Sequence, residues 1–365
     1  MARPVIITGG GTGGHIFPMQ AIAEALRARG LSSEEIVYVG SRRGKERTLL
    51  AGDASELITL PGRGIRRSLS PRALLQNVGA VCGLVAAQCL AVILVARRRP
   101  RAVVSVGGYA SSAVSLASVL WRRPLVLVAF DATEGAAHRV VSRFAARRCV
   151  AFPSSDPRDV VTGAPLRANV ASVTRTSVKT FDPSRPKWTV VVMTGSLGAA
   201  SVNRATLELA HAWREREDIR LVHVTGDRDY AWVRAQADEG GPYVLDYRIE
   251  AFGDMATLWS QCDVAICRAG AMTVAELTYL AIPSILVPLP HAPGDHQTKN
   301  ARVLVDHGAA LMVSDAGVSG SRLADAVESL VAHPDDLVSM GRAAGTLGRP
   351  NAAASIADVV LEVCR

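Results

Sequence analysis

The feature that most constrains the fold is a pattern that occurs twice: a short uncharged run, a glycine-rich turn and a helical stretch. The first copy leads from Val5-Ile6-Ile7 into a predicted helix over 18–29, the second from residues 189–193 into one over 202–214. Uncharged strands separated by helices are typical of parallel sheets covered on both faces. We therefore predict an α/β fold with two Rossmann-like, doubly wound domains. Ligands are expected beyond the carboxyl ends of the strands, in the cleft between the halves.

Composition narrows the choice of partners. The 365 residues suffice for two domains, and 49% hydrophobic with 20% charged residues excludes a disordered chain. The net charge of +8 suits an anionic partner, either a phosphorylated substrate or an acidic membrane surface. Aromatic residues make up only 5% and do not interleave with basic runs, so no nucleic-acid partner is expected. The six cysteines form no C-x-x-C pair, which favours reduced thiols over a zinc site or disulfides.

The segment Gly79–Ala96 bears on where the protein resides. The N-terminus enters a strand without a charged and apolar leader, which indicates a cytoplasmic protein. Gly79–Ala96 carries no charge and has the minimum length of a membrane span. It contains Gln88 and many small residues, so we favour a partly buried helix that lies against lipid headgroups. The alternative is a core helix between two solvated charge runs, which include Arg63, Arg66, Arg67 and Arg72 before it and Arg97, Arg98 and Arg99 after it.

The first glycine-rich turn predicts a phosphate site. Gly9, Gly11 and Gly14 satisfy G-x-G-x-x-G between a strand and a helix, a spacing that lets backbone N–H groups approach a phosphate. An NAD site would need an acidic residue after the second strand, where Gly40-Ser41-Arg42-Arg43 stands, and these arginines leave an NADP-dependent reductase as an alternative. A lone histidine is usually structural, but His15 is expected on this turn, exposed and facing the cleft. It is therefore a candidate general base.

A second constellation lies between Cys267 and Glu276, where a strand end, a glycine turn and a helix start near Thr273 are predicted. Thr273 and Glu276 have the spacing of a capping box, which alone would account for both residues. The alternative is functional: the helix N-terminus holds a diphosphate and Glu276 accepts hydrogen bonds from two ribose hydroxyls. The sequence leaves both interpretations open.

Six motifs, in this order, resemble the MurG family of glycosyltransferases (glycosyltransferase family 28): GGGTGGHIFP at 9–18, SVGGYAS at 105–111, GAPLR at 163–167, TGSLGA at 194–199, RAGAMTVAE at 268–276 and DHQTKNA at 295–301. The resemblance runs nearly end to end and implies a GT-B fold. It implies an acceptor-binding, membrane-facing domain over 1–165, a UDP-sugar domain over 166–349 and a last helix within 350–365 that returns to the first domain.

The implied activity is inverting transfer of N-acetylglucosamine from UDP-N-acetylglucosamine to the lipid-linked muramyl-pentapeptide of peptidoglycan synthesis. It would take place on the cytoplasmic face of the cell membrane, with cell-wall and division proteins as further candidate partners. The family works without a metal-holding D-x-D, and the chain has no convincing one, so no metal or other cofactor is expected. Helix N-termini and Arg167 would stabilise the leaving UDP.

Residue by residue, the resemblance implies the following site. His15 is the candidate catalytic base, beside Thr12, Gly13 and Gly14, which would face the donor sugar and the acceptor diphosphate. Arg167 and Ser196 correspond to donor contacts, with a linker salt bridge and a helix cap as their structural alternatives. Phe252 would pack by the uracil, and Gln297 would bind sugar hydroxyls. The diphosphate and ribose would be held by Ala271, Met272, Thr273, Val274, Ala275 and Glu276.

The chain departs from the family where HEQNAxxG is usual, since residues 128–135 read VAFDATEG. An amide that contacts the donor is thus replaced by Asp131, and a His-Glu pair by Val128-Ala129; Leu197 also stands where glutamine is usual. A carboxylate facing a diphosphate is unfavourable unless a cation or a proton offsets it. Three alternatives therefore stay open: a related transferase with another acceptor, a sugar-nucleotide epimerase, and a degenerate scaffold for division proteins.

Overall fold

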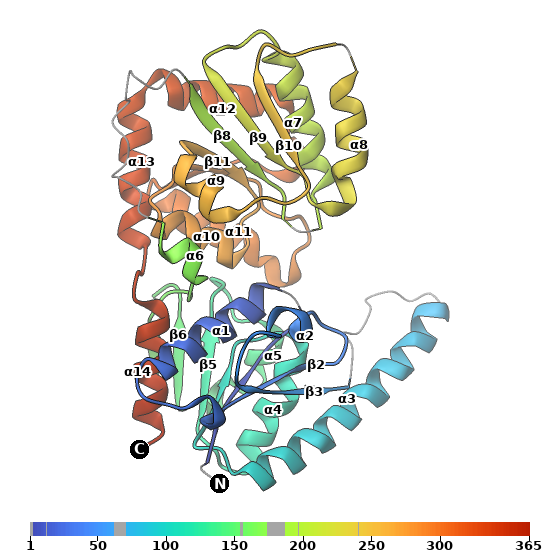
Figure 1. The fold of residues 1–365 in the computed structure, drawn as a ribbon, viewed down its shortest axis with the longest axis vertical. Helices are drawn as coiled ribbons and strands as arrows, with labels where there is room; N and C mark the ends of the chain where they lie inside the picture. The colour runs from blue at the N-terminus through green and yellow to red at the C-terminus, as the bar shows by residue number, and fades with distance from the viewer. Residues whose placement is uncertain are drawn as a thin grey trace. The chain divides into compact units, whose positions relative to one another are not determined.

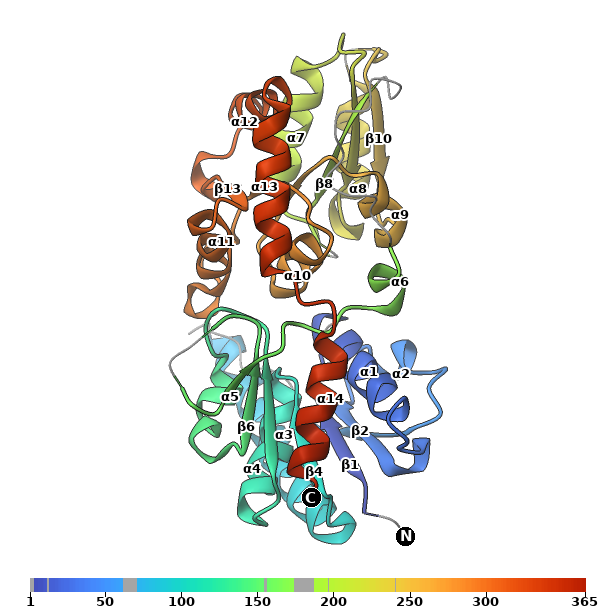
Figure 2. The same ribbon diagram turned by 90° about the vertical axis from the view of Figure 1, so that its left-hand side faces the viewer.

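A computed structural model describes residues 3–11, 13–61, 71–153, 156–173, 187–195, 197–239 and 241–365, with side chains in the long third helix from Gly79 onward. The chain divides into two compact units (Figures 1 and 2). Unit 1 contains Met1–Arg167 together with Asn351–Arg365, and unit 2 contains Ala168–Pro350. Each boundary lies within two residues of the one expected from the sequence.

Unit 1 is built on a parallel sheet of seven strands in the order β3-β2-β1-β4-β5-β6-β7. Their bounds are β1 Val5–Thr8, β2 Ile36–Ser41, β3 Glu56–Leu60, β4 Ala102–Ser105, β5 Leu125–Ala129, β6 Arg147–Val150 and β7 Asp159–Val161. The chain moves outward from β1 in one direction and from β4 in the other. The order therefore reverses between β1 and β4, and in such sheets the loops at this point bind ligands.

The described residues of unit 1 form the α-helices α1 Gly13–Arg27, α2 Glu46–Leu49, α3 Pro71–Arg98, α4 Tyr109–Leu120, α5 Ala136–Arg139 and α14 Ala352–Val363. Side chains of α3 and α4 pack on one face of the sheet, where they form a core with strand residues such as Ile6, Val103 and Leu127. Figure 2 shows α14, in red, beside α1, and α14 also contacts β4, β5 and β6. The last helix thus completes the unit that the first strand begins.

Unit 2 repeats the design with six parallel strands in the order β10-β9-β8-β11-β12-β13, which reverses between β8 and β11. The strands are β8 Trp188–Met193, β9 Ile219–Val224, β10 Asp246–Glu250, β11 Val264–Cys267, β12 Ser284–Leu286 and β13 Ala310–Met312. The helices are α6 Ala168–Ala171, α7 Ala200–Ala212, α8 Asp227–Asp238, α9 Met255–Gln261, α10 Ala271–Tyr279, α11 His296–Asp306, α12 Gly320–Ala332 and α13 Pro334–Leu347.

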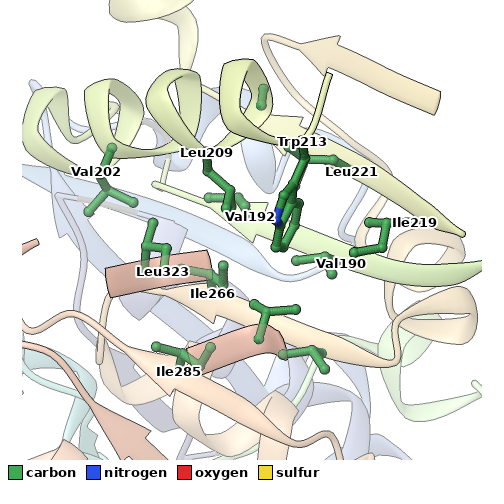
Figure 3. Close-up of a cluster of buried hydrophobic side chains, with 14 of the residues drawn as sticks. Val190, Val192, Val202, Leu209, Trp213, Ile219, Leu221, Ile266, Ile285 and Leu323 are labelled. Carbon is green, nitrogen blue, oxygen red and sulfur yellow. The ribbon is translucent and has the colours of Figure 1, made fainter. Parts of the chain in front are cut away.

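The core of unit 2 gathers β-branched strand residues beneath α7 and α12 (Figure 3). Val190, Val192 and Ile266 come from the central strands, and Leu209 and Leu323 from the two helices, all fully buried. Central strands that are apolar on both faces form only where helices cover both faces, as the sequence pattern predicts.

Candidate active site

The glycine-rich turn of unit 1 joins β1 to α1 at the point where the strand order reverses. Gly10 and Gly11 adopt φ angles of 125° and 93°, in the region that disfavours side chains. A Cβ atom on Gly108, in the loop after β4, would lie only 2.5 Å from the Gly10 carbonyl oxygen. The loop after β4 can therefore approach the turn this closely only because residue 108 is glycine. Thr12 lies outside the described residues.

His15 is the third residue of α1 and is partly buried, so its expected place on an exposed turn is wrong. The correction has a simple cause: Gly13 and Gly14 already belong to the helix, which therefore begins five residues earlier than predicted. Burial lowers the pKa of His15, and the nearby charges of Asp131 and Glu46 partly oppose this shift. The imidazole is thus neutral at pH 7, the state that a general base requires.

Asp131, which stands in place of the family's amide, lies in the loop after β5 and is partly buried. Its charge raises the pKa of His15. Because His15 is neutral at rest, it can offset the charge of Asp131 only when it takes up a proton.

His138 was missed by sequence reasoning, since no motif includes it. Its Nε2 lies 3.0 Å from Ser105 Oγ at the end of β4, and burial lowers its pKa to about 4. A Cβ atom on Gly107 would lie 3.4 Å from His15 Cδ2 and 3.7 Å from His138 Cε1. The two rings therefore share the space beside Gly107, and His138 contributes a neutral, hydrogen-bonded neighbour to His15.

Arg167, at the end of unit 1, places its guanidinium carbon 4.8 Å from the centre of the Phe17 ring on α1. Such stacking is a cation–π contact. This contact brings the GAPLR motif next to the first turns of α1, because Phe17 lies only two residues after His15 in the sequence.

In unit 2, α10 begins at Ala271, and Gly270 is its N-cap. Thr273 and Glu276 both lie inside the helix, so the capping-box interpretation is wrong: a capping box requires Thr273 to precede the first helical residue. Glu276 is only 4% exposed, and its Oε2 accepts the indole N–H of the fully buried Trp259 at 2.8 Å. Trp259 was not singled out from the sequence, where it is one apolar position of α9.

The turn before α10 is tied down by polar side chains. Arg268 donates to the carbonyls of Val287 and Pro288 (3.0 and 3.1 Å) and pairs with Asp315. The buried Asn300 of α11 donates to the Ala269 carbonyl at 3.0 Å. These contacts fix the backbone that leads into the first turn of α10.

The other predicted donor contacts are spread over the loops of unit 2. Phe252 follows β10 and is 59% exposed. Gln297 lies in the first turn of α11, where its Oε1 accepts the Leu289 N–H at 2.9 Å. Of the remaining α10 residues, Val274 is buried, while Ala271, Met272, Thr273 and Ala275 keep partial exposure. Ser196 lies outside the described residues. No cluster of three or more potential metal ligands occurs in the described part of the chain.

Two family models match the chain: the glycosyltransferase family 28 N-terminal domain over residues 5–150 and the C-terminal domain over 189–358. The chain belongs to glycosyltransferase family 28. The first match falls on unit 1, and the second covers most of unit 2 and the first part of α14.

Two curated relatives match along nearly their whole length. A protein of Alkalilimnicola ehrlichii is 38% identical over 368 residues, covering 100% of both chains, and one of Desulforudis audaxviator is 36% identical over 375 residues, covering 98% and 97%. Both are named UDP-N-acetylglucosamine–N-acetylmuramyl-(pentapeptide) pyrophosphoryl-undecaprenol N-acetylglucosamine transferase.

Solved structures with the same two-domain fold are similar to this chain along its length. The crystal structure of Acinetobacter baumannii MurG superposes with a TM-score of 0.76 at 26% identity, covering 99% of this chain and 100% of that one. The predicted GT-B class is thereby confirmed for this family 28 chain. A UDP-N-acetylglucosamine 2-epimerase of Neisseria meningitidis has a TM-score of 0.66 at 13% identity, which shows a shared fold alone.

Proposed function

We propose that this protein transfers N-acetylglucosamine from UDP-N-acetylglucosamine to undecaprenyl-diphospho-muramoyl-pentapeptide (lipid I), with inversion at the anomeric carbon. The observation that carries the proposal is the 38% identity, over the full chain, to a relative named for this reaction. Neither the epimerase nor the scaffold alternative has comparable support.

In the proposed reaction, unit 1 binds the acceptor and unit 2 the donor. The acceptor hydroxyl oxygen attacks the anomeric carbon, the bond from that carbon to the diphosphate oxygen breaks, and UDP departs with the electron pair. His15 takes the hydroxyl proton. The N–H groups of Gly13 and Gly14 in the first turn of α1 are offered to the acceptor diphosphate, because those of Gly9 and Gly11 already bond to Val39 and Glu46. Arg167, stacked on Phe17 near this turn, adds positive charge for the anionic substrates.

The donor half of the proposal rests on α10. Its N-terminus, held by Arg268 and Asn300, presents orphan N–H groups and a partial positive charge to the UDP diphosphate. The Glu276 carboxylate accepts hydrogen bonds from the ribose hydroxyls. Gln297 contacts the sugar, and the exposed Phe252 packs by the uracil. Ser196 completes the set by its place in TGSLGA.

The test of this function is to incubate purified protein with UDP-N-acetylglucosamine, with and without lipid I, and to follow UDP release. We expect release only with lipid I, with one disaccharide-linked lipid formed per UDP. Release without acceptor would favour the epimerase alternative, release with a different lipid alone would mean a changed acceptor, and no release with either would favour the scaffold.

We further propose that the protein binds the cytoplasmic membrane surface through α3. Its segment Gly79–Arg98 is long and apolar enough to cross a membrane by length and composition, but the helix packs along one face on unit 1. Ala80, Ala87, Ala91 and Val95 are buried against the unit, while four larger side chains are 43–58% exposed: Val81, Val85, Leu90 and Ile93. A helix held on a folded domain over this length cannot be surrounded by lipid, so it fits a surface contact.

Trp121 and two arginines lie next to the exposed apolar face of α3. Trp121, 48% exposed, donates its indole N–H to the Val92 carbonyl of α3 at 3.1 Å, which places an interfacial aromatic residue beside the helix. Arg97 and Arg99 are exposed at the end of α3. Arg63, Arg66 and Arg67 lie outside the described residues, as does the side chain of Arg72.

We expect the protein to float with vesicles that contain anionic lipid and to be released by salt, since each basic residue near the surface adds about 1 kcal/mol of attraction. The double variant Val85→Glu/Ile93→Glu should lose flotation. The matched control is Val244→Glu in unit 2, which alters a valine of similar exposure (48%) and should float normally. Equal binding to neutral vesicles, or normal flotation of the double variant, would remove this role for α3.

A further inference from the structure

A buried carboxylate outside every predicted motif lies against the glycine-rich turn of unit 1. Glu46 is the first residue of α2 and has no exposed surface. Its Oε1 accepts the N–H of Gly11, in the turn, and the N–H of Ser41, at the end of β2, each at 2.9 Å. One carboxylate oxygen therefore ties the turn after β1 to the end of the neighbouring strand.

Three glycines make room for this side chain. A Cβ atom on Gly10 or Gly44 would collide with the carboxylate oxygens of Glu46, and one on Gly40 would lie 2.7 Å from its Cγ. The glycines come from the turn, from β2 and from the loop before α2. Because all three surround one side chain, the backbone here is shaped to enclose the carboxylate rather than to leave it in solvent.

We propose that Glu46 is a positioning residue for the transfer reaction, whose carboxylate holds the Gly9–Gly14 turn against β2 and so fixes where His15 lies at the start of α1. The inference rests on the proposed role of His15 as the base. Gly11 is four residues before His15, and α1 begins between them, so a shift of the turn would move the imidazole.

The charge of Glu46 adds a second contribution. Three groups face His15 from three elements: Glu46 from α2, Asp131 from the loop after β5 and His138 from α5. The two carboxylates raise the pKa of His15, whereas burial lowers it. Burying a carboxylate is costly, and Glu46 Oε2 has no hydrogen-bond partner among the described residues. A positive charge on His15, formed when it takes the acceptor proton, would offset part of that cost and be stabilised in return.

Two substitutions separate position from charge. Glu46→Gln keeps the volume and an acceptor oxygen but removes the charge; we expect the pKa of His15 and the acid limb of kcat/KM to move together to lower pH by roughly half a unit or more. Glu46→Asp keeps the charge but withdraws the oxygens by one methylene; we expect kcat to fall about tenfold with the acid limb nearly unchanged.

The matched control is Asp53→Asn. Asp53 is another buried carboxylate of unit 1, held by Arg27, Tyr38 and the Ser55 N–H, and it does not face His15. The Asp53→Asn variant should have a lower Tm than the wild type but the same kcat and the same acid limb in its pH profile of kcat/KM.

The His15 titration is followed by NMR of the imidazole, assigned with His15→Gln. It needs neither donor nor acceptor, so it decides on Glu46 even if lipid I proves to be the wrong acceptor. An unchanged His15 pKa in folded Glu46→Gln, or the same shift in Asp53→Asn, would overturn the proposal. So would a wild-type kcat in Glu46→Asp.

Discussion

Replacing His15 by alanine is expected to lower kcat for sugar transfer by about a hundredfold or more and to leave UDP affinity nearly unchanged. A sugar hydroxyl is a poor nucleophile, so the reaction needs a base beside it. His15 lies at the start of α1 next to the glycine turn, whereas His138 is withdrawn into the unit and bonded to Ser105. The measurement is steady-state transfer to lipid I together with calorimetry of UDP binding.

The pH profile adds a second test of His15. Because burial outweighs its two carboxylate neighbours, the pKa of His15 lies below the usual 6.5. The base is therefore neutral above that pKa, and kcat/KM should be constant near pH 7 and fall as the pH drops through a value below 6.5. The alanine variant should lack this limb.

Asp131 is the rival base, and Asp131→Asn discriminates between the two. If His15 is the base, Asp131→Asn removes a charge that raises its pKa, so the acid limb moves to lower pH while turnover persists. If instead His15→Ala keeps near-native turnover and Asp131→Asn abolishes it, the proton goes to Asp131. The altered segment 128–135 would then define a different active site from that of the family.

Glu276→Ala is expected to weaken UDP binding about tenfold or more. Hydrogen bonds to a charged group contribute roughly 1.5–3 kcal/mol each, and the loss of 1.4 kcal/mol is already tenfold. The variant should also melt lower, because the buried indole N–H of Trp259 loses its acceptor. Calorimetry of UDP binding and thermal unfolding measure the two effects separately.

Two controls distinguish ribose binding from the internal contact. Trp259→Phe removes the indole donor but keeps the carboxylate, so stability should fall while UDP binds within a few-fold of the wild type. Glu276→Gln retains an acceptor for Trp259 but lacks the charge. Normal UDP binding by a less stable Glu276→Ala would show that this residue serves only to satisfy Trp259.

The central strands of both sheets and the two-unit division were predictable from the sequence because both depend on local patterns, whereas β3, β6, β7, β10 and β13 were not predicted. Runs such as Val264–Cys267 are uncharged, bounded by turn residues and too short for helices, and each forms the expected strand. Helix starts were predicted less well. Gly13 and Gly14 were taken as part of the turn, but their φ angles are not positive and both enter the first turn of α1. Thr273 was taken as a cap, but α10 already begins at Ala271, directly after its N-cap Gly270.

The parts of the site that were missed are those that depend on tertiary packing. Glu46 follows Arg42, Arg43 and Lys45, and in the sequence it belongs to a charge run that would normally be solvated. Only the folded chain shows that three glycines enclose it. His138 and Trp259 likewise gain their partners from residues 33 and 17 positions away, Ser105 and Glu276.

The place of α14 has a consequence for the order in which the chain folds during synthesis. Unit 2 is one continuous stretch of chain, whereas unit 1 needs α14, which leaves the ribosome only after the whole of unit 2. Until then the face of unit 1 that receives Ile356, Ala357 and Val360 has no cover. Nascent unit 1 must therefore wait, with an apolar face open to chaperones or to other chains, while unit 2 is translated. A segment made after unit 2 is thus the one that closes the unit begun before it.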